Sequence, residues 1–208
     1  MELIDLLPAV QRIRDVNLDA ASRAATYLRT YPDIIATAIA PGEPDLSRLH
    51  RVALMAYGWM PRVLRLNPEH LSSAVLVLKK GLVATADNWT MVPVEDLANC
   101  LNSVVGASKV LHFTNPQVFP IWDSGVERFR QRAEVSQYHM RQPQNYVNYA
   151  REVHVIAQAR EFGPFFSLVS EAFQARLKAL GIAPYQVSKV RAIEAAAFEL
   201  SDEHTDAD

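Results

Sequence analysis

Apolar residues recur at steps of three and four along almost the whole chain, which is the spacing that lines one face of an α-helix. The first such segment places five apolar residues in register, namely Leu3, Leu6, Leu7, Val10 and Ile13. Runs that alternate apolar with polar residues are short, and no Asn-Gly or Asp-Gly pair marks a hairpin turn between strands. The sequence therefore predicts an all-α fold, a globule built from many helices.

Capping residues and helix breakers set the expected bounds of these helices. Asn67-Pro68 is a start signal, because asparagine caps a helix and proline suits its first position. Lys79-Lys80-Gly81 is a stop signal, with cations at the negative end of the helix dipole and glycine after them. Tyr31-Pro32 is expected to end a helix, since the residue before proline avoids the α region. Ser188 is expected to cap the last helix.

The length of 208 residues and the formal net charge of −2 suit a compact protein that is neither strongly basic nor strongly acidic. Residues 1–200 are expected to form a single helical domain, or two lobes that comprise residues 1–92 and 93–200. Residues 201–208 contain four acids and no Lys or Arg, so we expect a flexible acidic tail. The single cysteine, Cys100, excludes an internal disulfide.

Targeting and membrane signals are missing from the sequence. No segment approaches the roughly 20 uncharged apolar residues of a membrane span. The first fifteen residues carry acids at Glu2 and Asp5 and lack the basic start and apolar core of a secretory signal. We therefore expect a cytoplasmic protein without a membrane partner.

The chain also lacks the motifs of several common enzyme classes. It contains no GxGxxG, GxxxxGK[ST], GxSxG or HExxH pattern. No two of its six histidines stand four residues apart, which argues against a helical zinc site. We expect neither a metal nor a cofactor, and we interpret His112 and His154 as core or boundary histidines because their neighbours are apolar.

The most informative segment contains a lysine and an aspartate fourteen positions apart. A helix over Val94–Val104, a turn near Val105–Ala107 and a helix from Ser108 would place Lys109 at a helix start. The helix dipole and partial burial would then lower the pKa of the Lys109 amine, which favours nucleophilic chemistry. Asp123 or Ser124 is expected to cap the next helix, whose N-terminus would stabilise a carboxylate.

This segment, Leu101–Phe129 with the sequence LNSVVGASKVLHFTNPQVFPIWDSGVERF, resembles the helix-hairpin-helix DNA glycosylase superfamily of the 8-oxoguanine glycosylase and endonuclease III type. In that superfamily a hairpin opens the helix that bears a catalytic lysine, and a proline-containing loop leads to an essential aspartate. The matching positions are Lys109 and Asp123. The resemblance makes residues 94–114 a degenerate helix-hairpin-helix element, since the turn keeps only Gly106 and has Ser103 where a glycine is usual.

The resemblance implies a hydrolase of DNA base-excision repair that binds double-stranded DNA and flips a damaged base into a pocket. Lys109 would attack the sugar C1′ and form a Schiff base, and Asp123 would stabilise the positive charge on the sugar. The implied DNA-binding residues are those of the hairpin, the nearby arginines and one aromatic side chain: Gly106, Ser108, Arg128, Arg130, Arg132 and Trp122.

Two other interpretations stay open at this point. Asp123 is a good helix cap whatever the function, and Trp122 suits a core anchor as well as a base platform. A noncatalytic helical protein that binds nucleic acid or another protein would show the same residues. A component of a bacterial stress or defence system is a further alternative, which rests on size and fold class alone.

Overall fold

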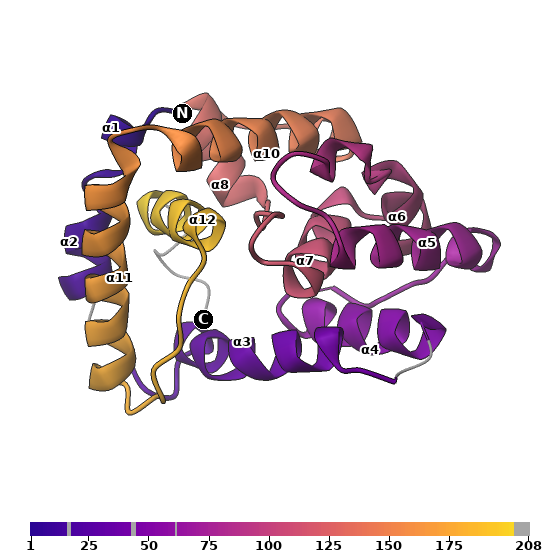
Figure 1. Cartoon of the computed structure of the whole chain (residues 1–208), viewed down its shortest axis with the longest axis horizontal. Coiled ribbons are helices and arrows are strands. Elements are labelled where there is room, and N and C mark those ends of the chain that lie inside the picture. The colour runs from indigo at the N-terminus through magenta and orange to yellow at the C-terminus, as the bar shows by residue number, and fades with distance from the viewer. Residues whose placement is uncertain (16–17, 43–44, 61, 202–208) are drawn as a thin grey trace.

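The computed structural model describes residues 1–15, 18–42, 45–60 and 62–201, and within these residues every regular element is helical (Figure 1). The all-α prediction is therefore confirmed. In chain order the α-helices are α1 (Leu3–Leu6), α2 (Ala9–Asp15), α3 (Arg23–Ile39), α4 (Asp45–Gly58), α5 (Leu71–Leu82), α6 (Val94–Leu101), α7 (Val104–Thr114), α8 (Ser124–Gln131), α9 (Gln137–Met140), α10 (Pro143–Gln158), α11 (Phe162–Ala179) and α12 (Lys189–Leu200). Two 3-10 turns, η1 (Pro68–His70) and η2 (Trp89–Met91), precede α5 and α6.

Side-chain caps begin several of these helices where the sequence predicts them. Asn67 accepts a hydrogen bond from the backbone N–H of Glu69 at the start of η1. The Asp123 carboxylate and the Ser188 hydroxyl cap α8 and α12, each accepting from the backbone N–H three residues on. These contacts satisfy backbone donors that have no partner inside the helix.

The prediction that a helix ends at Tyr31-Pro32 is wrong, because α3 continues through Pro32 to Ile39. Proline inside a helix costs about 3 kcal/mol, since it removes a hydrogen bond and crowds the preceding turn. Burying one large apolar side chain contributes about 1.5–3 kcal/mol. Tyr31, Ile34 and Ala38 all lie on the buried face of α3, so core packing on both sides of the proline outweighs its cost.

The turn between α6 and α7 lies earlier than the sequence indicates. Asn102 takes a left-handed conformation with φ of 51°, and Ser103 caps α7 by accepting from the backbone N–H of Gly106. The expected turn at Val105–Ala107 is instead part of α7. This correction moves Lys109 from a helix start to the middle of α7.

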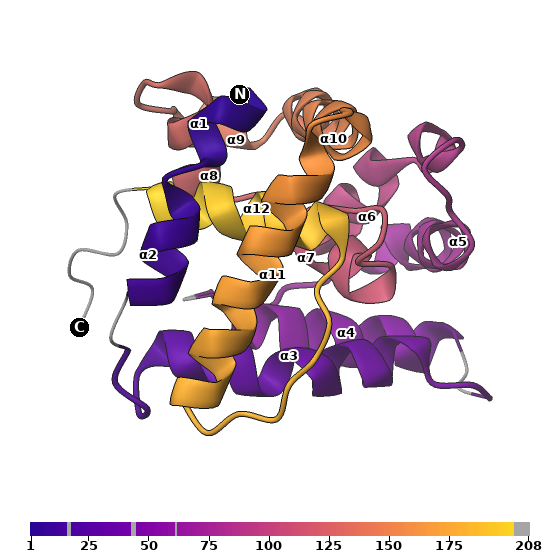
Figure 2. The same ribbon diagram turned by 60° about the vertical axis from the view of Figure 1, so that its left-hand side comes forward.

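The helices sort into two groups by their most extensive contacts. The central group comprises α3–α7, and the terminal group comprises α1 and α2 together with α8–α12. Figures 1 and 2 both show α2 beside α11 on one side of the molecule, with α4, α5, α6 and α7 gathered on the other. Helices from the two sides of residues 92 and 93 pack on each other, such as α5 on α6 and α2 on α11. One continuous apolar core links both groups, and contacts of α10 with α6 and α7 join them.

No helix among the described residues is both long and apolar enough to cross a lipid bilayer.

Candidate functional site

Lys109 is a buried cation at the centre of the molecule. Its helix, α7, is covered by α3, α4, α5 and α6, and only 8 % of the residue is exposed. The Lys109 ammonium donates a hydrogen bond of 3.5 Å to the backbone carbonyl of Trp59. Burial lowers the pKa of Lys109, because removal from water disfavours the charged amine. The lowered pKa has the predicted direction, and burial, one of the two causes predicted, produces it; the other, a helix N-terminus, does not apply because Lys109 lies in the middle of α7.

Asp123 lies close enough to Lys109 for their charges to interact. Asp123 caps α8 and accepts a hydrogen bond of 2.9 Å from the Val126 backbone N–H. Its charge opposes the lowering of the Lys109 pKa, and so does the charge of Glu194. The structure therefore places the two predicted catalytic residues within range of each other's charge, with Lys109 on the central group and Asp123 on the terminal group.

The helix α12 adds two charged residues that sequence reasoning missed. Arg191 and Glu194 form an ion pair, and Glu194 is 2 % exposed. Burial raises the pKa of Glu194 to about 7, although the Arg191 charge acts in the opposite direction. The Arg191 guanidinium also lies 5.1 Å from the centre of the Tyr31 ring, within range of a cation–π contact. The sequence did contain one sign that Glu194 is buried: it stands four residues after Val190, on the apolar face of α12.

His112 joins α7 to α3 and to the loop before α8. Its Nδ1 lies 2.7 Å from the Phe119 carbonyl, and its Nε2 lies 2.8 Å from the Tyr31 hydroxyl. Because a carbonyl only accepts, Nδ1 carries the proton and Nε2 accepts from Tyr31. Burial lowers the pKa of His112 to about 3. The interpretation of His112 as a satisfied core histidine is confirmed. The same holds for His154, which is buried with its Nε2 2.9 Å from the Val118 carbonyl.

Three of the residues assigned to DNA binding lie inside the protein. A Cβ atom on Gly106 would stand 2.7 Å from the Tyr57 hydroxyl, so this glycine allows close packing of α7 on α4. The Ser108 hydroxyl bonds to both the backbone N–H and the carbonyl of Trp122. Trp122 is fully buried and donates through Nε1 to Glu127. All three residues are buried, so none lies on a surface that a DNA strand could contact in this conformation.

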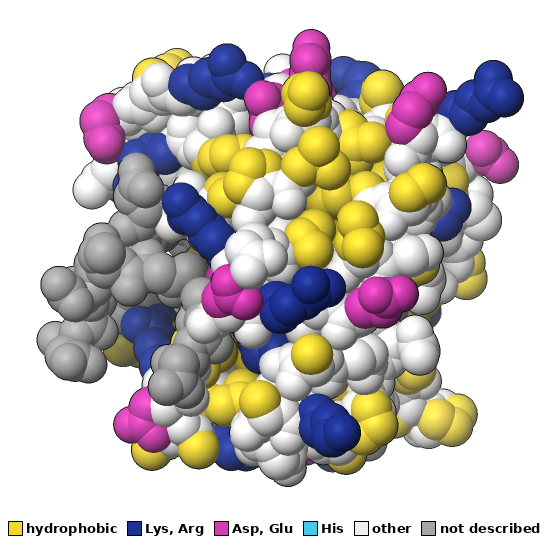
Figure 3. Space-filling view, turned by 90° about the vertical axis from the view of Figure 1, so that its left-hand side faces the viewer, with side chains coloured by type: hydrophobic (Ala, Val, Ile, Leu, Met, Phe, Trp, Pro, Cys, Tyr) yellow, Lys and Arg dark blue, Asp and Glu magenta, His cyan; other side chains and the backbone are white. Residues whose placement is uncertain are grey.

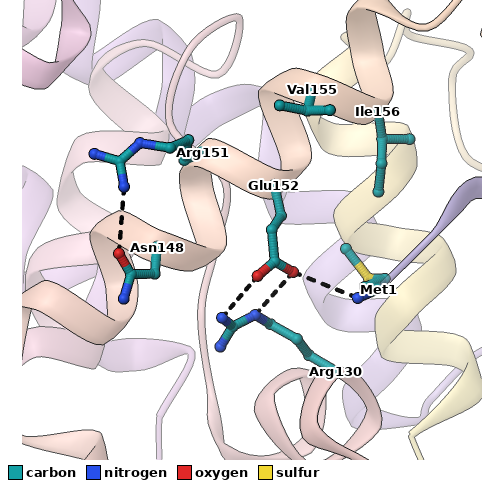
Figure 4. A pocket seen from close by; sticks show the side chains of 7 residues that line it. All are labelled: Met1, Arg130, Asn148, Arg151, Glu152, Val155 and Ile156. Carbon is teal, nitrogen blue, oxygen red and sulfur yellow. Dashed lines mark hydrogen bonds and ion pairs between the residues drawn. The ribbon is translucent and has the colours of Figure 1, made fainter.

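The predicted phosphate-binding arginines lie on α8 or just after it, beside acids. Arg130 contacts Glu127 at 2.6 Å. It also contacts Glu152 at 2.8 Å, and both of these side chains line a surface pocket (Figure 4). Arg132 pairs with Asp5 at 2.7 Å. Arg128 lines a second pocket together with Arg132 and with two acids, Asp5 and Glu134. These carboxylates reduce the positive potential that a DNA phosphate would meet.

Charges of both signs are also interspersed on the face that turns toward the viewer in Figure 3, around a group of apolar side chains. Among the described residues, no three His, Cys, Asp or Glu side chains are placed to hold a metal ion. The site therefore offers a buried amine with a lowered pKa, whose charge interacts with those of Asp123 and Glu194.

Comparison with protein-family models, with curated proteins and with solved structures finds no match to this chain.

Proposed function

We propose that the protein is a DNA glycosylase with lyase activity, in which Lys109 is the nucleophile and Asp123 is the charge-stabilising carboxylate. The observation that carries the proposal is the buried Lys109 amine, whose pKa is lowered and which interacts with Asp123 across the two groups of helices. A neutral amine is the reactive form of lysine, and burial is one of the ways enzymes obtain it.

The proposed reaction uses the two residues in distinct roles. The Lys109 nitrogen attacks the sugar C1′ while the bond from C1′ to the base breaks, and the base leaves with the electron pair and takes up a proton. Loss of the amine proton and opening of the sugar ring give a Schiff base at C1′. Asp123, held at the start of α8 by the Val126 N–H, stabilises the positive charge that develops on the sugar.

The test is base release from duplexes that contain 8-oxoguanine, uracil, alkylated purines or oxidised pyrimidines, with borohydride added to trap a Schiff base. We expect Lys109→Met to abolish trapping, and Asp123→Asn to slow it by about 100-fold or more while still capping α8. Lys80→Met is the matched control, because Lys80 is exposed on α5, and it is expected to behave as wild type. Absence of release and trapping from every duplex with folded protein would overturn the proposal.

A second candidate function is noncatalytic binding of nucleic acid or of another protein. The pairing of Arg130 with Glu127 and Glu152, and of Arg132 with Asp5, weakens the attraction for phosphates and so favours a protein partner over nucleic acid. Fluorescence anisotropy with an undamaged DNA duplex at increasing salt concentration measures whether the protein binds DNA without catalysis. Affinity that falls steeply with salt and is unchanged in Lys109→Met would support noncatalytic DNA binding.

A further inference from the structure

Two exposed arginines at the beginning of α3 have no acidic partner among the described residues. Arg23 donates to the Tyr27 hydroxyl. Arg29 donates to the backbone carbonyls of Ala20 and Leu180, at 2.7 and 3.3 Å. Since hydroxyl and carbonyl oxygens carry no net charge, both guanidinium groups keep a positive charge that is available to an anion.

The arginines on α8 lie in a contrasting environment. Arg130 and Arg132 are both paired with carboxylates, as described above. At the beginning of α3, the acid that stands next in the sequence is Asp19, and its side chain accepts from the Ala21 backbone N–H at 2.9 Å. A phosphate therefore meets less competition from protein carboxylates at α3 than at α8.

The Arg23 side chain is held in place while most of its donors stay free. Its Nε donates to the Tyr27 hydroxyl, and the centre of the guanidinium lies 5.2 Å from the centre of the Tyr27 ring, within range of a cation–π contact. Its two terminal amino groups have no hydrogen-bond partner among the described residues. A guanidinium in this arrangement can bind two oxygens of one phosphate.

Three consecutive hydrogen bonds join the exposed Arg23 to the buried Lys109. The first runs from Arg23 to the Tyr27 hydroxyl. The Tyr27 hydroxyl then donates to the Trp59 carbonyl at 3.0 Å, and the same carbonyl accepts from the Lys109 ammonium at 3.5 Å. The Tyr27 and Trp59 rings also stack, with their centres 4.8 Å apart. The surface that carries Arg23 therefore lies over the part of the core that holds the proposed nucleophile.

We propose that the beginning of α3 is the surface on which this protein holds the sugar-phosphate backbone of DNA. Arg23 binds a phosphate through its two terminal amino groups, and Arg29 binds a neighbouring phosphate through its remaining N–H groups. The inference deepens the function proposed above and rests on it for the choice of DNA as the partner. Phosphate contacts fix the position and orientation of a duplex, so contacts at this place would align a strand beside the site of Lys109.

The test is fluorescence anisotropy of a labelled, undamaged DNA duplex with wild type and Arg23→Gln at several salt concentrations. Arg23→Gln is expected to weaken binding by about tenfold at low salt, because a hydrogen-bonded charge contact is lost. It is also expected to reduce the slope of log affinity against log salt by about 1, since one phosphate contact fewer releases counterions. Arg23→Lys keeps the charge and is expected to restore most of this slope.

Arg160→Gln is the matched control, because it removes the same charge from another exposed arginine without an acidic partner among the described residues. Arg160 lies just before α11, whose 18 residues span about 27 Å, and Leu180 follows the far end of that helix. Figures 1 and 2 both show this far end near the beginning of α3. At such a distance salt screens the charge, so Arg160→Gln is expected to change the affinity by less than about twofold.

Three results would overturn the inference: no binding of the duplex by wild type, equal affinity and salt slope in wild type and Arg23→Gln, or an equal loss in Arg160→Gln. The duplex is undamaged, so the measurement needs no chemistry. Binding that depends on Arg23, without base release or trapping from any damaged duplex, would overturn the glycosylase proposal alone. Release and trapping by wild type, with binding unchanged in Arg23→Gln, would overturn only the assignment of the surface.

Discussion

At the scale of single residues, the buried amine of Lys109 makes the folded state less stable than an apolar side chain would. Its pKa in the folded protein is lower than the ordinary 10.5, so the unfolded chain holds more protons between the two values. Stability therefore rises as pH increases through that interval, and below it the burial of the charged amine destabilises the fold. A residue retained at such a cost is expected to serve function.

We predict that Lys109→Met raises the free energy of unfolding by about 1 kcal/mol at pH 7 while it removes activity, because methionine fills the space without a buried charge. Urea denaturation measures the change. Lys80→Met, at an exposed position on α5, is expected to shift stability by less than about 0.5 kcal/mol. A loss of several kcal/mol in Lys109→Met would contradict the prediction and indicate that the ammonium stabilises the fold.

His112 gives a second prediction at this scale, on the acid side. Its folded pKa is about 3 and its unfolded value 6.5, so the unfolded chain binds the extra proton first as pH falls. Its contribution to stability is complete above pH 6.5 and is lost towards pH 3, at about 1.4 kcal/mol per pH unit. His112→Gln can make the same two hydrogen bonds without titrating, so its stability is expected to fall less steeply with acid.

Denaturation at several pH values measures the His112 effect, with His70→Gln at a partly exposed position as the control. If the stability of wild type and of His112→Gln falls equally as pH is lowered, groups other than His112 cause the loss of stability in acid.

The sequence identifies some of these residues and misses others for a physical reason. Asp123 could be found because a cap follows from local sequence. Lys109 was singled out by a turn that the structure places earlier in the chain, so its burial in the middle of α7 was not predicted. Glu194 and Arg191 were missed because an ion pair three residues apart is common on exposed helix faces. Their importance comes from the burial of Glu194, which only the tertiary structure shows.

At the scale of elements, the close packing of α7 on α4 depends on a residue without a side chain. Alanine in place of glycine inside a helix usually stabilises it, by about 1 kcal/mol. At Gly106 the new Cβ would lie 2.7 Å from the Tyr57 hydroxyl, which donates to the Leu101 carbonyl at the end of α6. The clash therefore acts on α4, α6 and α7 together.

We predict that Gly106→Ala destabilises the protein by about 2 kcal/mol, because the overpacking outweighs the helix preference of alanine. The control is Gly163→Ala, where no atom lies within 4 Å of the added Cβ in the first turn of α11. It is expected to be neutral or slightly stabilising. Thermal unfolding of both variants shows whether each change raises or lowers stability. A stabilised Gly106→Ala would show that α4 moves aside at little cost.

The identity of the helices could be predicted better than their bounds. Apolar spacing and caps locate α5, α8 and α12, since both signals are local. The continuation of α3 through Pro32 depends on burial against distant helices. The position of the turn at Asn102 depends on a left-handed conformation that the sequence pattern does not reveal.

At the scale of the whole molecule, the first helices of the chain complete a structure formed mainly by the last ones. Arg176 on α11 donates to the backbone carbonyls of Ile13 and Arg12 on α2 and pairs with Glu199 on α12. One buried guanidinium thus joins segments more than 160 residues apart. A boundary read along the sequence, such as residues 92 and 93, does not reveal this pairing of the two ends.

We predict that Arg176→Met and Glu199→Leu each destabilise the protein by about 3–5 kcal/mol, because each removes one member of a buried ion pair. The double variant removes both charges, so its loss of stability is expected to be smaller than the sum of the two by at least about 1.5 kcal/mol. Urea denaturation of wild type, the two single variants and the double variant completes this double-mutant cycle. Changes that add within error would mean that the two side chains stabilise the fold independently. The association of the first helices with the last ones would then depend on the apolar packing of α2 against α11 and α12 alone.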